Sequence, residues 1–225
     1  MEKISVLLAL FTIVLAIAGC GQRGETISNS QQVKNGNQPA DLNTVWDGTP
    51  PSYEAIPDFF ADAPEINAFP ESVAGLWEAE LLAPIAKWDI DFEPDGSIKW
   101  IYHALAGRIN IEEGGTESNT EDSYYVFVMG PCEARYIPST RTLKVKIIVD
   151  YFIMNIPAGK IEGRQEDYFE GPISEDGYTW GTQWRSFRWI KGGPPPDINY
   201  MRAAPDPLVF IKIDPNNPPE EPPLR

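Results

Sequence analysis

The sequence predicts an all-β domain over residues 71–213, and three observations support this class. Apolar and polar residues alternate with a period of two, most clearly over residues 88–93, where Trp, Ile and Phe alternate with acidic residues. Turn-forming residues such as Pro94–Ser97 separate the alternating stretches, and no stretch shows sustained helical periodicity. We expect a single antiparallel meander of about eight or nine strands that closes into a barrel, because closure removes exposed edges. A β-sandwich is the alternative.

The strands are expected where apolar runs lie between turn signals. They cover residues 73–80, 88–92, 98–105, 124–129, 132–137, 143–154, 160–173, 178–190 and 208–213. A bend at Gly130–Pro131 separates two of them, and turns at 138–141 and 174–177 join others.

One predicted strand, over residues 143–154, is unusually long. A period of two places six of its residues on one face: Leu143, Val145, Ile147, Val149, Tyr151 and Ile153. At about 3.3 Å per residue, a strand of this length spans on the order of 40 Å. It must therefore bend inside a compact domain.

The front of the domain resembles the lipocalin family. Gly75-Leu76-Trp77 is similar to the Gly-x-Trp pattern near the start of the first lipocalin strand. The run Trp-x-Ile-x-Phe-x-Pro-Asp-Gly at 88–96 is also seen in small lipocalin-like domains. The resemblance implies a lipocalin-like barrel, and a barrel of about eight strands encloses room for side chains or for one small ligand.

The N-terminal segment predicts where the protein resides. Residues 4–16 are almost unbroken apolar sequence, shorter than the roughly 20 residues of a membrane-spanning helix and typical of a signal peptide. The segment ends in Ile17-Ala18-Gly19-Cys20, which resembles the lipobox of bacterial lipoproteins at all four positions. The resemblance implies a signal peptide over 1–19 and a lipid anchor on Cys20 that holds the protein at the membrane. Gly21, in place of the Asp that commonly retains such proteins at the inner membrane, favours the outer membrane of a Gram-negative cell.

Three segments flank the predicted domain. Residues 20–49 are rich in Gly, Asn, Gln and Ser, which is typical of a flexible tether. Residues 50–70 alternate prolines with aromatic and aliphatic residues, which predicts an extended segment that lies over the domain. Residues 214–225 contain five prolines and are expected to form a disordered tail.

The charge balance excludes one class of partner. The chain has 33 acidic and 18 basic residues, giving a formal net charge of -15. Because phosphate binding needs clustered Lys and Arg, we expect no nucleic-acid partner. If Cys20 carries lipid, Cys132 has no cysteine to pair with, and we expect it to be a buried, inert thiol.

No motif for catalysis or for metal binding occurs in the sequence. The single histidine, His103, has neither a triad partner at a recognisable spacing nor a second metal ligand nearby. An acidic group surrounds Gly114-Gly115, formed by Glu112, Glu113, Glu117, Glu121 and Asp122. Its spacing fits no EF-hand, so a long solvated loop is favoured over a calcium site. We expect no metal, no cofactor and no enzymatic activity; a hydrolase or isomerase using His103 with Glu112 is the enzymatic alternative.

Aromatic residues supply the candidate ligand site. Six tryptophans lie on predicted strands, and most are expected in the core. The candidates for lining a cavity that holds an apolar ligand are Trp100, Tyr102, Tyr151, Trp180 and Trp184. The charged residues at 162–167 are expected to form surface ion pairs with Arg185 and Arg188 on the next strand. The alternative is an arginine cluster that binds an anionic ligand.

These observations lead to two functional hypotheses. The first is a membrane-anchored envelope lipoprotein whose barrel binds a small apolar ligand without catalysis. The alternative is a structural or protein-interaction lipoprotein of the envelope, with a barrel filled by its own side chains and proline-rich flanks that contact partners.

Overall fold

A computed structural model describes residues 46–51, 54–63, 69–80, 87–103, 107–119, 124–157, 159–196 and 205–214. All of them belong to the compact unit Ala40–Arg225. The predicted signal peptide, Cys20, most of the predicted tether and residues 215–225 lie outside the described residues. None of the helical segments in the described ranges has the length and apolar character that a membrane crossing requires.

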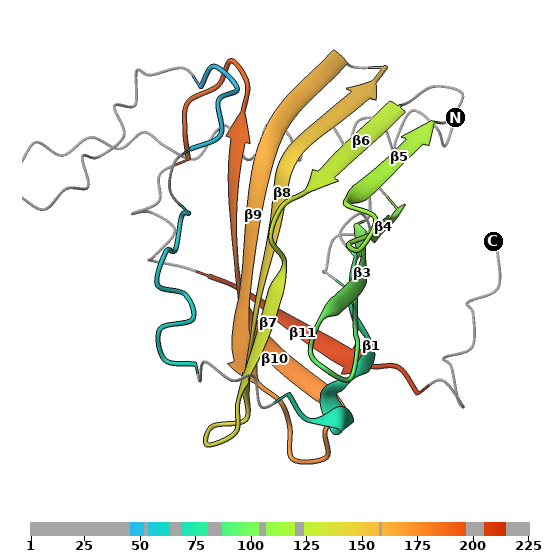
Figure 1. Ribbon diagram of the computed structural model, residues 1–225, viewed down its shortest axis with the longest axis vertical. Helices are drawn as coiled ribbons and strands as arrows, with labels where there is room; N and C mark the ends of the chain where they lie inside the picture. The colour runs from blue at the N-terminus through green and yellow to red at the C-terminus, as the bar shows by residue number, and fades with distance from the viewer. Residues whose placement is uncertain are drawn as a thin grey trace, which may run out of the picture. The chain divides into compact units, whose positions relative to one another are not determined.

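The described chain forms one sheet of 11 strands in which every pairing is antiparallel (Figure 1). A short 3-10 helix, Glu71–Val73, precedes the first strand. In chain order the strands are β1 Gly75–Glu80, β2 Lys87–Phe92, β3 Ile98–His103, β4 Gly107–Asn110, β5 Gly115–Asn119, β6 Tyr124–Met129, β7 Glu133–Ile137, β8 Thr142–Ile156, β9 Gly159–Pro172, β10 Thr179–Ile190 and β11 Asp206–Lys212.

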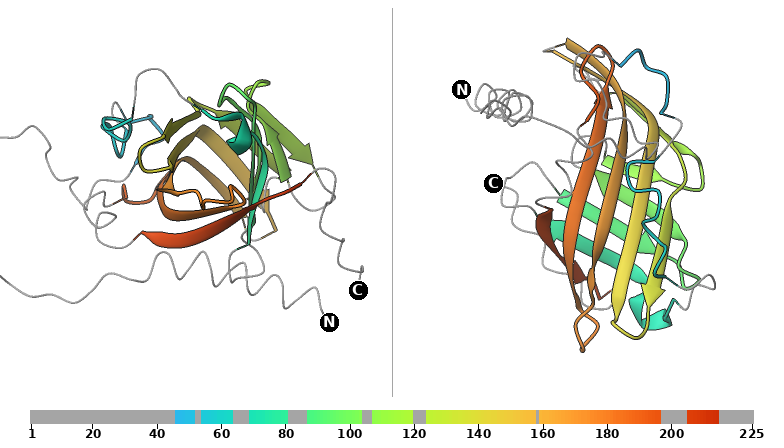
Figure 2. Two further views of the ribbon diagram at one scale, coloured as in Figure 1. Left: turned by 90° about the horizontal axis from the view of Figure 1, so that it is seen from below. Right: turned by 90° about the vertical axis from the view of Figure 1, so that its left-hand side faces the viewer.

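The sheet closes on itself. Its strand order runs from β6 back through β5, β4, β3, β2 and β1 to β11, and then through β10, β9 and β8 to β7. Because β6 also pairs with β8, hydrogen-bonded neighbours form a ring, with β7 attached to β8 (Figure 2). The prediction of an all-β antiparallel meander that closes is confirmed, with more strands than expected.

The two strands beyond the nine predicted ranges form a hairpin at the acidic stretch, which we expected to be a loop. Strands β4 and β5 form here around the turn 111–114. Gly115 has a φ of 138°, and a Cβ at this position would lie 1.9 Å from the carbonyl oxygen of Phe127. The close approach of β5 to β6 therefore depends on a glycine. Because the stretch is mostly polar, it lacks the apolar alternation by which strands are predicted, and the pairing was not expected.

The predicted bend at Gly130–Pro131 is present, and it divides the partner of β8 into two strands. β6 pairs with β8 over residues 149–155, and β7 pairs with it over 142–146. A Cβ on Gly130 would lie 2.7 Å from the carboxyl group of Asp150, so a larger residue at the bend would displace this side chain.

The long strand β8 contains a β-bulge that corrects one expectation. The pairing with β9 shifts between Val149 and Phe152, so that Phe152 is buried in the core. Tyr151 and Ile153 therefore leave the face of Leu143, which we had expected them to share. A bulge inserts an unpaired residue and bends the strand, which a strict period of two does not anticipate.

The main hydrophobic core fills the space between opposite sides of the ring, and we call the sheet face that carries it the inner face. Its largest fully buried side chains are Trp77, Trp180, Phe152, Phe169, Phe210, Ile90, Ile101, Ile109 and Leu143. The ring of Trp180 stacks on that of Phe210, with centroids 4.7 Å apart. Its indole nitrogen donates to the carbonyl oxygen of Gly171 at 3.1 Å, so this buried donor is satisfied.

A second cluster lies on the outer face, beneath residues 54–63, which we call the strap. Phe59 of the strap meets the ring of Tyr168 edge-on at 5.0 Å, and the cluster also contains Ala55, Phe187 and Trp189. The Lys144 ammonium donates to the carbonyl oxygen of Phe59 at 3.0 Å. The strap thus runs across strands β8 to β10 (Figure 2).

Candidate functional site

The inner face carries one row of polar side chains among its apolar residues. Register pairs Gln165 of β9 with Arg188 of β10, and Asp167 of β9 with Ser186 of β10. Both pairs lie on the face of Ile147, which pairs with Asp167 from β8. We call these four residues the inner polar row.

Hydrogen bonds link the inner polar row into a chain. Nε of Arg188 donates to Oε1 of Gln165 at 2.9 Å, and Nε2 of Gln165 donates to Oδ2 of Asp167 at 2.6 Å. The indole nitrogen of Trp184 donates to Oδ1 of Asp167 at 3.0 Å. Gln165 therefore stands between the two charged groups, which make no direct ion pair among the described residues.

Burial dominates the electrostatics of the row. Asp167 has no exposed surface, and burial raises the pKa of its carboxyl. The neighbouring Gln165 and Ser186 side chains, and then the charge of Arg188 and the indole of Trp184, oppose this shift. Burial also lowers the pKa of the Arg188 guanidinium, and the charge of Asp167 opposes this shift. The row thus holds a carboxyl and a guanidinium in an environment that disfavours the charged form of both.

Two polar groups of the row have donors without acceptors. Within the described chain, the Nη atoms of Arg188 have no hydrogen-bond or ion-pair partner. The Oγ of Ser186 is buried and has no hydrogen-bond partner among the same residues. The Arg188 side chain is only partly buried, so its Nη donors, like the buried Ser186 hydroxyl, mark positions where a further partner would fit.

Apolar side chains border the inner polar row on both sides. Toward one end of the ring, Phe152 lies over Gly163, where a Cβ would come within 2.5 Å of its ring. Further apolar residues there are partly buried and contact the core: Met154, Ile161, Tyr125 and Ile190. On the other side, Trp184 stacks on Phe169 at 6.2 Å and meets Trp88 edge-on at the same separation.

The polar sequence of β9 is buried on both faces, which corrects our expectation of surface ion pairs. On the outer face, Arg164 pairs with Asp150 and, at 2.8 Å, with Glu166. Glu166 has no exposed surface because the strap covers it. Neither pair involves Arg185 or Arg188. The strap residues lie more than 100 positions earlier in the chain, so local sequence gives no sign of this burial.

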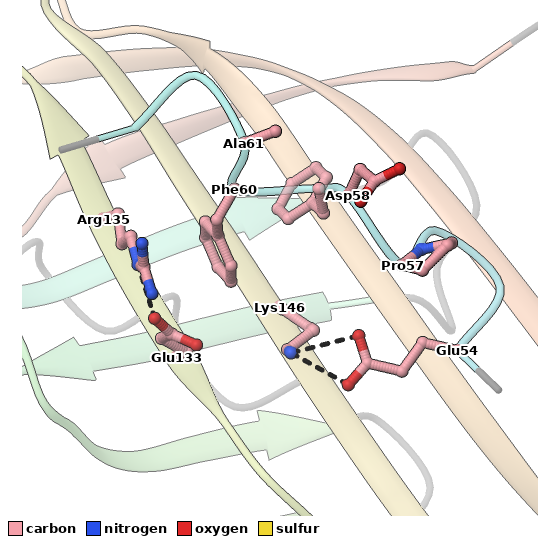
Figure 3. A pocket seen from close by; sticks show the side chains of 9 residues that line it. Glu54, Pro57, Asp58, Phe60, Ala61, Glu133, Arg135 and Lys146 are labelled. Carbon is pink, nitrogen blue, oxygen red and sulfur yellow. Dashed lines mark hydrogen bonds and ion pairs between the residues drawn. The ribbon is translucent and has the colours of Figure 1, made fainter. Parts of the chain in front are cut away.

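A second candidate is a hollow of about 430 Å³ between the strap and strands β7 and β8 (Figure 3). Its two cations, Arg135 and Lys146, lie 4.9 and 5.5 Å from the ring centre of Phe60. Each cation already has a carboxylate partner, since Arg135 pairs with Glu133 and Lys146 with Glu54. The hollow therefore offers no unpaired cation, and we favour the inner polar row.

The structure does not bring the five predicted lining residues together. Trp180 and Trp184 lie on the inner face, and Trp180 is fully enclosed by core side chains. Trp100 and Tyr102 alternate with the buried Ile101, so they lie on the outer face, where the Arg108 guanidinium sits 4.4 Å from the Trp100 ring centre.

Tyr151 lies elsewhere on the outer face, and its hydroxyl donates to Glu162 at 3.1 Å. Sequence reasoning found Trp184 but missed Gln165, Asp167 and Ser186 as site residues, and it named Arg188 only as part of an alternative. Gln165 and Asp167 are polar residues at alternate positions of β9, and this pattern could have indicated a polar row on one face. The positions between them, on the outer face, are polar as well, so the pattern does not stand out in the sequence.

The remaining candidates from the sequence are not part of the inner polar row. His103 ends β3 opposite Trp88, and its side chain lies outside the described residues, as do Glu121 and Asp122. Cys132 is a free thiol, and burial raises its pKa to about 11. Over the described ranges, no group of three His, Cys, Asp or Glu residues is arranged to hold a metal ion.

Comparison of the chain with protein-family models, with curated proteins and with solved structures found no match. The resemblances to lipocalins and to bacterial lipoproteins therefore stay predictions from short motifs. The function has to follow from the geometry and chemistry of the site.

Proposed function

We propose that the protein is a lipid-anchored envelope protein that binds a small apolar ligand, without catalysis, on the inner face of its strand ring. The observation that carries this proposal is the inner polar row, in which Arg188 has unpaired donors beside partly buried apolar side chains. Ligand sites in proteins are mostly apolar with a few convergent polar groups, and this combination fits that description.

The anchor part of the proposal rests on Cys20 and the apolar segment before it. Several acyl chains on one cysteine hold a protein firmly, since each buried methylene contributes about 0.8 kcal/mol and one chain alone is marginal. The ligand-binding domain would then act at a membrane surface, where apolar molecules are concentrated.

The second candidate function is a structural or protein-interaction role. It is favoured by an exposed apolar group on the outer face around β11. Val209 and Ile211 are 53% and 48% exposed, and Tyr178, whose neighbour Thr179 pairs with Ile211, is 55% exposed. An exposed apolar patch is a common feature of partner surfaces.

Mass spectrometry of copurifying molecules tests the first proposal. The full chain is purified from membranes, extracted with organic solvent and compared with two variants that add a charge to partly buried isoleucines. Ile161→Lys alters the inner face, whereas Ile153→Lys alters the outer face of the neighbouring strand. We expect an apolar molecule in extracts of the wild type and of Ile153→Lys, and its loss from Ile161→Lys. Extracts without any such molecule would favour the interaction role.

A further inference from the structure

We propose that the ligand is an apolar molecule that ends in a carboxylate, and that Arg188 binds this carboxylate on the inner face. The inference rests on the proposed function, because it names the class of ligand that the inner face would take. It follows from the donors that Arg188 leaves unused, from the charges around it and from the position of the apolar side chains.

Arg188 has far more hydrogen-bonding capacity than the described chain uses. A guanidinium carries five N–H donors in a fixed plane. Only Nε of Arg188 has a partner in the described part of the chain, Oε1 of Gln165 at 2.9 Å. The edge formed by the two Nη atoms can bind a carboxylate through two parallel hydrogen bonds. Gln165 holds the guanidinium from the opposite side, so the edge that is left faces away from it.

The neighbouring carboxyl group does not serve as the partner of Arg188. Both oxygens of Asp167 accept hydrogen bonds from neutral groups, Nε2 of Gln165 and the indole of Trp184. Burial lowers the pKa of Arg188, and the charge of Asp167 offsets this only in part. A ligand anion would supply the missing interaction.

The charge of the site indicates a monoanion. Arg188 is the one cation in the inner polar row, because the other basic residues of β8 and β9 that are buried face outward. Lys144 and Lys146 contact the strap, and Arg164 pairs with Asp150 and Glu166. A phosphate dianion would face one guanidinium with the Asp167 carboxyl close by, whereas a carboxylate balances the single positive charge.

The apolar part of the ligand has a defined direction. The next inward residues along β9 and β10 after Gln165 and Arg188 are Gly163 and Ile190, and Ile161 follows on β9. Phe152 covers Gly163 from β8. A chain or ring attached to the carboxylate would contact these side chains, which are apolar and, at Ile161 and Ile190, partly exposed.

Binding of a matched acid and amide tests the inference. The full chain in nanodiscs is titrated with octanoate or with neutral octanamide, each isotope-labelled at the carbonyl carbon and followed by NMR, and empty nanodiscs give the background. We expect octanoate to bind at least tenfold more tightly, since a charge-assisted hydrogen bond contributes about 1.5 kcal/mol or more. Arg188→Gln should lose this preference, and Arg185→Gln, at an outer-face position opposite Tyr168, should keep it.

The outcomes separate the inference from the proposed function. Equal binding of octanoate and octanamide by the wild type would overturn the inference and leave ligand binding intact. If neither probe binds but the purified protein contains a neutral apolar molecule, the inference is likewise overturned and ligand binding stands. Binding of neither probe and an empty extract would overturn both. If circular dichroism shows that Arg188→Gln does not fold, the relative affinity of the wild type for octanoate and octanamide tests the inference without the variant.

Discussion

The backbone N–H of Ala55 donates a 2.8 Å hydrogen bond to Oε2 of Glu166, a fully buried carboxylate 111 residues later in the chain. This bond joins the strap to the outer face of β9. Glu166 also accepts hydrogen bonds from Tyr168 and Arg164, so it has four donors on its two oxygens. The strap and a buried ion pair therefore depend on the same side chain.

Replacing Glu166 with glutamine should destabilise the protein by about 1 to 3 kcal/mol, because Arg164 loses its buried partner and keeps only its ion pair with the partly exposed Asp150. The free energy of unfolding in urea measures the effect. The control is Glu175→Gln, since Glu175 is 87% exposed and pairs with Arg141 at the surface. That pair should contribute about 0.5 kcal/mol or less. A Glu166 variant as stable as the control would show that the buried pair does not stabilise the protein.

Two glycines on neighbouring strands should respond differently to alanine. A Cβ on Gly171 of β9 would lie 1.8 Å from the carbonyl oxygen of Gly181 of β10, and backbone cannot yield as a side chain can. A Cβ on Gly181 would meet nothing within 4 Å. We expect Gly171→Ala to lower the thermal unfolding midpoint by several degrees or more and Gly181→Ala to leave it nearly unchanged. Equal midpoints would mean that β9 and β10 separate at little cost.

The Cys132 thiol should react slowly with alkylating reagents in the folded protein. Burial raises its pKa to about 11, so roughly one molecule in ten thousand carries a thiolate at neutral pH. We expect iodoacetamide to label Cys132 only as urea unfolds the chain. Ser139→Cys, at an exposed turn position, supplies a thiol that should react at once. Rapid native labelling at Cys132 would show that the strands around it open.

The lipid anchor makes a separate prediction. Radiolabelled palmitate should enter the wild-type protein in growing bacteria and should not enter Cys20→Ser, which should also leave the membrane fraction. Cys132→Ser is the matched control, because it removes the other cysteine of the chain and should keep both label and fractionation. Equal labelling of all three proteins would contradict the assignment of Cys20.

Local sequence predicted most of the strands and turns of the sheet, and particular residues explain where the prediction was wrong. The alternation of Trp88, Ile90 and Phe92, followed by Pro94–Ser97, defines a hairpin that the structure contains, with β2 paired to β3. The residues after Val149 were predicted on the wrong face, because a bulge shifts the alternation. In a strand that is apolar at successive positions, the sequence does not show such a shift.

The candidate site was less accessible to sequence reasoning, for a physical reason. Residues 164–167 read Arg-Gln-Glu-Asp, which is typical of an exposed strand. All four are buried, two beneath the strap and two on the inner face of a ring closed by the distant pairing of β6 with β8. Burial of this kind depends on contacts between segments far apart in the chain, and local periodicity does not report them.

The pH dependence of stability should reveal the buried carboxyl of Asp167. Its pKa in the folded protein is raised by burial, whereas in the unfolded chain it is about 3.9. Below that value both states are protonated, so the contribution of the protonated form is fully present and stability does not change with pH through this group. As the pH rises, the unfolded chain releases the proton first, so ionisation favours unfolding and the stabilising contribution of the protonated form is lost through the raised pKa.

Asp167→Asn isolates this effect, because it keeps the shape of the side chain and removes its titration, while every other group is shared with the wild type. We expect the wild type to lose stability relative to Asp167→Asn as the pH rises from about 4 toward neutrality. Urea unfolding of both proteins across this range measures the difference. A difference that does not change with pH, or that moves in the wild type's favour, would mean that the ligand-free site holds Asp167 as a stable carboxylate. Arg188 would then be balanced internally and would have little need of a ligand anion.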